Sequence, residues 1–186
     1  SVLKQELQML KTLRKLHDRK GSSVDDKILN QVLEKNEHLN QEQRAAVQHV
    51  TQHGQAIRIV QGYAGTGKTT MLRTAVQAWH KAGYNVVGAC FTGVAADNLQ
   101  EEIGIPCDTI HMTLADLPDD LFDTARRAVV HTGKQLVRAA LDKKTYRYQK
   151  PKRPYIDSKS IVLLDEAGMI NTRHMLMLME WVEKNN

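Results

Sequence analysis

One stretch of the chain reads Gly62-Tyr63-Ala64-Gly65-Thr66-Gly67-Lys68-Thr69. It fits the phosphate-binding pattern G-x-x-x-x-G-K-[ST], in which glycines let backbone N–H groups converge on an anion. An apolar run at 57–60 precedes the stretch, and a helical pattern continues from Thr70. The order strand, glycine turn and helix predicts a nucleoside triphosphate site, because the N-terminus of the helix adds positive dipole charge.

The residue types in this loop predict separate roles. The Lys68 ammonium can reach the β- and γ-phosphates, and the Thr69 hydroxyl can bind Mg²⁺. The other loop residues are expected to contact the nucleotide through their backbone. The predicted nucleotide-binding residues of this loop are Gly62, Ala64, Gly65, Thr66, Gly67, Lys68, Thr69 and Thr70.

An acidic motif follows a second apolar run. Residues 161–164 are Ile, Val, Leu and Leu, and they lead into Asp165-Glu166-Ala167-Gly168-Met169. An Asp at the tip of a buried strand can hold Mg²⁺, and the next Glu can orient or deprotonate an attacking water. Both motifs would lie beyond the carboxyl ends of the strands, where open α/β sheets bind ligands. We predict Thr69 and Asp165 as Mg²⁺ ligands. The predicted catalytic residues are Lys68, Asp165 and Glu166; an ordinary acidic strand end is the alternative.

Length and composition fit one well-cored domain with a small appendage. The chain has 186 residues, of which 41% are hydrophobic, and a mean hydropathy of -0.45. It contains no apolar run of membrane-spanning length and no secretory signal pattern. Cys90 and Cys107 lack metal or redox spacing, which indicates reduced thiols and a cytoplasmic location. A net charge of +5 is compatible with a polyanionic partner.

Helix and strand patterns predict a parallel α/β sheet with helices before it. Asn40 is the predicted N-cap of one helix, with Gln43 at the capping-box position. Gly83 is expected to close the helix that follows the phosphate loop. The predicted helices cover about 2–16, 25–35 and 69–82, and the predicted strands cover 57–61, 85–91 and 160–164. We expect a helical N-terminal extension over 1–38 and one domain over 39–186.

An insertion is predicted at about 115–156. It contains an amphipathic helical pattern at 119–143, and residues 126–153 carry ten Lys or Arg against one acidic residue, with Tyr146, Tyr148 and Tyr155 nearby. Basic groups and aromatic faces suit single-stranded nucleic acid. A solvated helix face followed by a basic loop explains the same pattern, so both interpretations stay open.

Three further motifs accompany the phosphate loop and the acidic motif. They are Leu39-Asn40-Gln41-Glu42-Gln43-Arg44-Ala45-Ala46-Val47, Phe91-Thr92-Gly93-Val94-Ala95-Ala96 and Thr109-Ile110-His111. In this order, the motifs resemble those of the first motor domain (1A) of superfamily 1 RecD-like helicases, a RecA-like P-loop NTPase fold. The chain looks most like the helicase half of conjugative-transfer relaxase/helicase proteins of the Tra type. The resemblance runs from about residue 36 to residue 186, with a poor match over 114–156.

The resemblance implies further functional residues. Gln43 would contact the adenine of ATP, and Thr92, Gly93 and His111 would contact single-stranded DNA. It also implies ATP and Mg²⁺ as cofactors, with DNA as the partner. A GTPase is disfavoured because the chain has no Asn-Lys-x-Asp segment to read guanine.

The family continues beyond the acidic motif into a Gly-Asp-x-x-Gln strand and a second RecA-like domain that supplies arginine fingers. Its nicking domain lies upstream. None of these occurs in the sequence, so we expect a fragment whose missing second domain is supplied elsewhere. Two functions remain open. One is the N-terminal motor half of an ATP-dependent DNA helicase; the other is an ATP-binding module or inactive remnant with little turnover.

Overall fold

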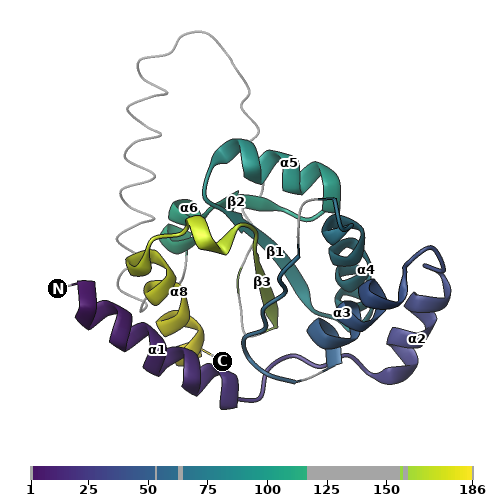
Figure 1. The fold of residues 1–186 in the computed structure, drawn as a ribbon, viewed down its shortest axis with the longest axis horizontal. Coiled ribbons are helices and arrows are strands. Elements are labelled where there is room, and N and C mark those ends of the chain that lie inside the picture. Colours follow the sequence, from purple (N-terminus) through teal and green to yellow (C-terminus); the bar gives the residue numbers. More distant parts are fainter. Residues whose placement is uncertain (1, 53, 63–64, 117–155, 157–158, 186) are drawn as a thin grey trace, which may run out of the picture. The chain divides into compact units, whose positions relative to one another are not determined.

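The computed structural model describes residues 2–52, 54–62, 65–116, 156 and 159–185 (Figure 1). The strands are β1 (Asn85–Cys90), β2 (Cys107–Thr109) and β3 (Ser160–Leu164). The helices are α1 (Val2–Asp18), α2 (Asp26–Glu34), α3 (Gln41–Gln52), α4 (Lys68–Lys81), α5 (Gly93–Ile103), α6 (Ile110–Asp116), the short 3₁₀ helix η1 (Ala167–Met169) and α8 (Thr172–Asn185).

The described strands form one parallel sheet in the order β2-β1-β3. Gly88 of β1 pairs with Cys107, and Ala89 pairs with Leu164. Parallel pairing places the carboxyl ends of all three strands at one edge of the sheet. Thr92, Ile110 and Asp165 therefore leave the sheet at the same edge. The predicted parallel α/β sheet with flanking helices is confirmed.

The strands predicted at 85–91 and 160–164 are confirmed as β1 and β3, but the strand predicted at 57–61 is wrong. Residues 57–62 adopt no regular secondary structure, and the Ile59 side chain is 71% exposed. An apolar composition favours a strand only where a neighbouring backbone can pair with it. The described sheet gives this run no pairing partner. In contrast, three residues suffice for β2 because β1 supplies their partners.

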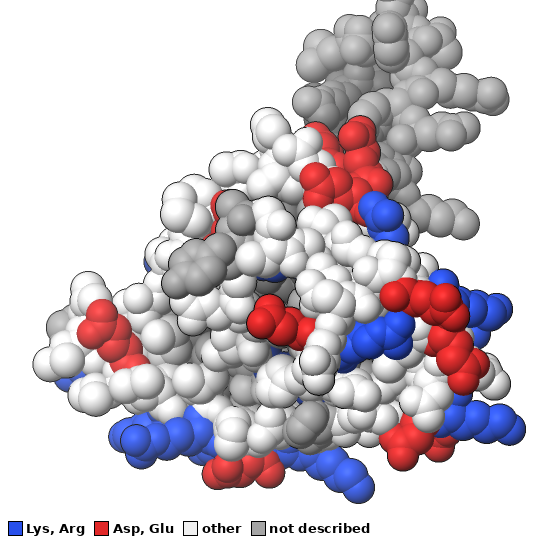
Figure 2. All heavy atoms as spheres, turned by 45° about the vertical axis from the view of Figure 1, so that its right-hand side comes forward, with Lys and Arg blue, Asp and Glu red and all other residues white. Residues whose placement is uncertain are grey.

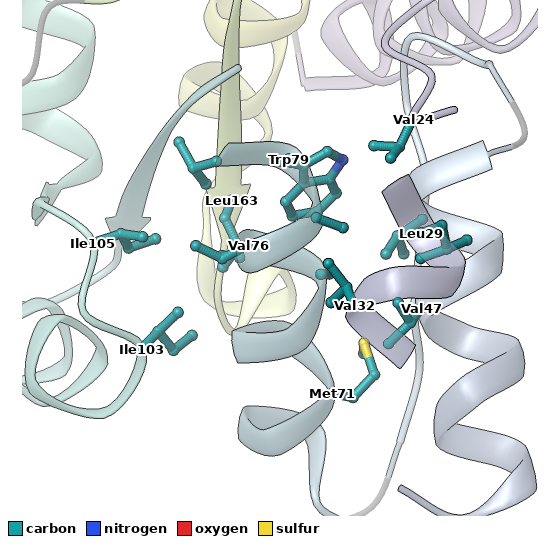
Figure 3. Packing of buried hydrophobic residues seen from close by; sticks show 14 of the residues in the cluster. Val24, Leu29, Val32, Val47, Met71, Val76, Trp79, Ile103, Ile105 and Leu163 are labelled. Atoms are coloured by element: carbon teal, nitrogen blue, oxygen red, sulfur yellow. The ribbon is translucent and has the colours of Figure 1, made fainter. Parts of the chain in front are cut away.

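Helix α4 lies at the centre of the hydrophobic core. Its residues Val76 and Trp79 are buried with Leu29 of α2 and Leu163 of β3. Figure 3 shows α4 with α2 and α3 on one side and the sheet with the end of α5 on the other. This two-sided burial fixes the helix that follows the phosphate loop. The residues labelled in that view are Val24, Leu29, Val32, Val47, Met71, Val76, Trp79, Ile103, Ile105 and Leu163.

Helix α8 packs against α1 (Figure 1). Thr12 and Leu16 of α1 and Trp181 of α8 are buried, and Lys15 Nζ lies 2.6 Å from Glu183 Oε1. Exposed ion pairs contribute little to stability, so burial of the facing side chains carries this contact. Leu178 and Met179 of α8 are buried as well.

The predicted N-terminal extension contributes to the central core. Val24, Val32 and Leu33 belong to the same buried cluster as α4, and the domain boundary after residue 38 remains a prediction. The predicted helix at 119–143 and the basic stretch at 126–153 lie outside the described residues. No described helix is both long enough and apolar enough to cross a membrane.

Leu29→Ala should destabilise the chain by about 2–5 kcal/mol, because it leaves a cavity in a packed core. Leu29 is 0% exposed, whereas Leu10 on α1 is 50% exposed. The matched substitution Leu10→Ala should change the free energy of unfolding by less than about 0.5 kcal/mol. Urea unfolding of both variants measures the difference. Equal small losses would mean that α2 is not part of the hydrophobic core.

Candidate nucleotide-binding site

Two glycines of the phosphate loop have backbone conformations that other residues rarely adopt. Gly65 has φ +79° and Gly67 has φ +78°, both in the left-handed region, which glycine enters without steric cost. A Cβ on Gly67 would also meet the side-chain amide of Gln43, which would have to move away. Both glycines are therefore required by the geometry as well as by the sequence pattern. The neighbouring Tyr63 and Ala64 lie outside the described residues.

The Lys68 side chain folds back over the start of the loop. A Cβ added to Gly62 would lie 3.2 Å from Lys68 Cγ and 3.3 Å from Lys68 Cδ. Gly62 thus provides room for the aliphatic part of the lysine. Lys68 is exposed, and within the described ranges its ammonium forms no ion pair. The ammonium remains available to a bound anion.

The N-terminus of α4 is open to a ligand. Its N-cap is Gly67, which provides no side-chain cap, and the first turn holds no acidic residue. The first N–H groups of a helix have no partner inside the helix, and the helix dipole attracts negative charge there. Thr70 lies in this first turn and is half-buried. Backbone amides, dipole and lysine therefore all favour an anion at the loop.

Gln43 joins the start of α3 to the phosphate loop. Its Oε1 accepts from Asn40 N at 3.0 Å, and its backbone N donates to Asn40 Oδ1 at 2.8 Å. This is the predicted capping box. Its Nε2 also donates to Thr66 O at 3.1 Å. A carboxamide has two N–H donors, so one is left over. The structure places Gln43 beside the loop, and its contact with adenine remains a prediction.

The acidic motif begins where β3 ends. Asp165 N donates to Ala89 O at 3.3 Å, and Glu166 N donates to Asp165 Oδ1 at 3.0 Å. Glu166 has φ +50° and is the one non-glycine residue with positive φ in the described part of the chain. This conformation costs about 1–2 kcal/mol for an L-residue, and such strain is concentrated at functional sites. The bend leaves Asp165 half-buried and Glu166 exposed.

Two reduced cysteines lie near the acidic motif. Burial, together with the negative charges of Asp165 and Glu166, raises the pKa of Cys90 to about 11. Burial is also the main cause that raises the pKa of Cys107, to about 12. Both thiols are free, as the cysteine spacing predicted. Their surroundings keep them protonated and unreactive.

The Thr69 hydroxyl has a partner that sequence reasoning missed. Thr69 Oγ1 donates to Glu102 Oε2 at 3.1 Å, and Glu102 lies in the last turn of α5. No sequence motif links these two residues; only the packing of α5 on α4 brings them together. Within the described ranges, no hydrogen bond joins Thr69 to Asp165, the other predicted Mg²⁺ ligand.

The donor set nevertheless suits Mg²⁺. This cation prefers oxygen ligands and is held by one or two carboxylates together with substrate phosphates and water. Thr69 supplies a hydroxyl oxygen and Asp165 supplies a carboxylate. Among the described residues, no cluster of three or more His, Cys, Asp or Glu could hold a metal ion. Thr69 and Asp165 supply the kinds of oxygen ligand that a cation bound together with a nucleotide would use.

The residues predicted to contact DNA follow β1 and β2. Thr92 caps α5 by accepting from Ala95 N at 3.2 Å, and a Cβ on Gly93 would meet nothing within 4 Å. The His111 ring lies 4.2 Å from the His174 ring, centroid to centroid. Burial lowers the pKa of His174, and His111 and Arg173 add to this shift. DNA contacts by Thr92, Gly93 and His111 remain predictions.

The face drawn in Figure 2 carries both acidic and basic side chains. Ten of the 26 Lys and Arg residues fall in 126–153, outside the described residues. The basic surface proposed from the sequence is therefore not tested by the described structure.

Comparison with known families assigns the chain. A family model described as AAA domain matches residues 38–186. The chain belongs to this AAA domain family. The match covers the phosphate loop, the acidic motif and the sheet between them, and it confirms the predicted P-loop NTPase fold.

Proteins similar to this chain include conjugal transfer proteins. The conjugal transfer protein TraA of Rhizobium radiobacter is 30% identical over 175 residues, which are 94% of this chain and 13% of that protein. The probable conjugal transfer protein TraA of Sinorhizobium fredii is 31% identical over 169 residues, 91% of this chain and 12% of that protein. The predicted resemblance to Tra-type proteins is confirmed. The chain spans only a small part of these relatives.

The raised pKa values predict slow thiol chemistry. A thiol with a pKa near 11 is only about 0.1% thiolate at pH 8, against about a quarter for an unperturbed cysteine. We expect Ellman's reagent to modify the native chain at least ~100-fold more slowly than the urea-unfolded chain at pH 8. The native rate should increase as the pH rises towards 11. Rapid modification of both native thiols at pH 8 would contradict the assigned environments.

Proposed function

We propose that this chain is the ATP-binding motor domain of a DNA helicase that acts in conjugative transfer. The observation that carries the proposal is the phosphate loop itself. Three features of the described residues support an anion site for a triphosphate: left-handed glycines, a start of α4 without a side-chain cap, and a Lys68 that forms no ion pair. The family match and the names of the TraA relatives support the wider assignment.

Each described residue of the proposed nucleotide site has a separate role. The loop amides and Lys68 would bind the triphosphate, and the remaining Gln43 N–H would contact the adenine. Thr69 and Asp165 hold Mg²⁺, which neutralises phosphate charge when it is bound. Glu166, exposed and bent away from β3, orients or deprotonates the attacking water.

Single-stranded DNA is the proposed partner of the longer protein in the cytoplasm, and strand separation is proposed for that whole protein. Thr92, Gly93 and His111 support a DNA contact, because they follow strands whose carboxyl ends share one edge. Slow ATP turnover by this chain alone is the expected behaviour. An arginine supplied by another domain contributes ~10³–10⁵ in rate in related sites, and Arg73 of α4 is already bound to the Glu102 carbonyl.

Lys68→Ala should weaken Mg-ATP binding at least ~10-fold, because it removes the only cation that the loop itself provides. Lys81→Ala is the matched control, since Lys81 lies in the last turn of the same helix. This control should bind ATP as the unchanged chain does. Isothermal titration calorimetry compares the three proteins. If the unchanged chain gives no binding heat, or if both variants bind equally well, the proposed function is wrong.

A further inference from the structure

The hydrogen bond from Thr69 to Glu102 determines how the hydroxyl is oriented. A carboxylate can only accept, whereas a hydroxyl has one proton and two lone pairs. In the 3.1 Å contact, Thr69 therefore gives its proton to Glu102. Both lone pairs of Thr69 Oγ1 are left for other partners. A cation binds through such lone pairs, so the contact prepares the hydroxyl to be a ligand.

A second interaction fixes the backbone of Glu102. Arg73 Nε donates to Glu102 O at 2.9 Å, and Arg73 Nη2 donates to the same oxygen. The last carbonyls of a helix have no partner inside it, so Arg73 satisfies one of them. Arg73 follows Thr69 by four residues on α4 and lies on the same helix face. On one face of α4, Thr69 thus hydrogen-bonds to the side chain of Glu102 and Arg73 hydrogen-bonds to its backbone carbonyl.

Packing keeps this arrangement in place. Leu99 and Ile103, which flank Glu102 on α5, are buried in the same cluster as Val76 of α4. The Glu102 side chain itself is exposed. Burial of Leu99 and Ile103 fixes the end of α5. The exposed Glu102 carboxylate therefore stays beside Thr69, where the phosphate loop ends.

We propose that Glu102 is a positioning residue of the cation site, one that orients the Thr69 hydroxyl and places a negative charge beside the Mg²⁺ bound with the nucleotide. The inference rests on the proposed function, because it assigns a partner to the Mg²⁺ ligand of the same site. Residues that hydrogen-bond to a metal ligand and orient it increase metal affinity by roughly 10–100-fold. Glu102 takes that role for Thr69.

The test compares nucleotide affinity with and without Mg²⁺. Fluorescence titrations with an ATP analogue bearing a methylanthraniloyl group would use the unchanged chain, Glu102→Ala, Glu102→Gln and the control Glu101→Ala. Glu101 is the adjacent exposed glutamate on α5, so the control removes the same charge one residue away. In Glu102→Ala, the factor by which Mg²⁺ increases nucleotide affinity should be about 10-fold smaller than in the unchanged chain. The affinity of Glu102→Ala in EDTA should stay equal or rise, because a negative charge near the triphosphate is gone.

The other variants separate orientation from charge. The Gln carboxamide oxygen still accepts a hydrogen bond, so Glu102→Gln should fall between Glu102→Ala and the unchanged chain. Glu101→Ala should retain the full gain from Mg²⁺. Thermal unfolding of each variant checks that the fold is intact.

Four results would overturn the inference. An unchanged Mg²⁺ gain in Glu102→Ala would make the contact incidental, and a larger gain would mean that Glu102 competes with the cation for Thr69. Equal losses with and without Mg²⁺ would reveal a purely structural role. If the unchanged chain does not bind Mg²⁺-nucleotide, the proposed function fails and the inference fails with it. If the unchanged chain binds Mg²⁺-nucleotide normally and the Glu102 substitutions have no effect, only the inference is wrong and the proposed function stands.

Discussion

The backbone of β1 hydrogen-bonds in parallel to β2 on one side and to β3 on the other. Because parallel strands all point the same way, their carboxyl ends must meet at one edge. Thr92 and Asp165 consequently follow neighbouring strands at that edge, although 73 positions of sequence separate them. Antiparallel pairing of β3 would move Asp165 to the opposite edge. The candidate site depends on this direction of pairing more than on any single side chain.

Two kinds of interaction place the phosphate loop relative to the sheet. Apolar burial holds α4 from both sides, with Leu29 and Val47 in one direction and Leu163 in the other. Hydrophobic burial is the dominant contribution to stability, but it is non-directional and does not fix how the packed elements are oriented. Polar bonds provide the direction: Gln43 holds the Thr66 carbonyl, and Arg73 holds the Glu102 carbonyl. Each bond contributes little net stability, yet the first joins α3 to the phosphate loop and the second joins α4 to the end of α5.

The sequence predicted those features that depend on local pattern. The capping box of Asn40 and Gln43 follows from residue types three positions apart, and β1 follows from a run of buried apolar residues. The glycines of the loop were predictable because glycine enters the left-handed region, here φ +79° at Gly65 and +78° at Gly67, without steric cost. These features need no knowledge of distant residues.

The features that were missed depend on partners distant in sequence. Residues 57–61 have the composition of a strand but no paired neighbour in the described sheet. Cys107–Thr109 has too few residues to give a pattern, yet β1 makes it a strand. Glu102 reaches Thr69 only because α5 packs on α4. Long-range pairing and packing therefore set the limit of what the sequence alone could predict.

A crystal structure of the chain with Mg²⁺ and a non-hydrolysable ATP analogue tests the central claim most directly. We predict the β-phosphate within hydrogen-bond distance of the backbone N–H groups between Gly65 and Thr69, about 2.7–3.2 Å. The cation should lie about 2.0–2.1 Å from Thr69 Oγ1, with that hydroxyl still bonded to Glu102. A nucleotide bound elsewhere with the loop empty, or a cation that does not contact Thr69, would contradict the account.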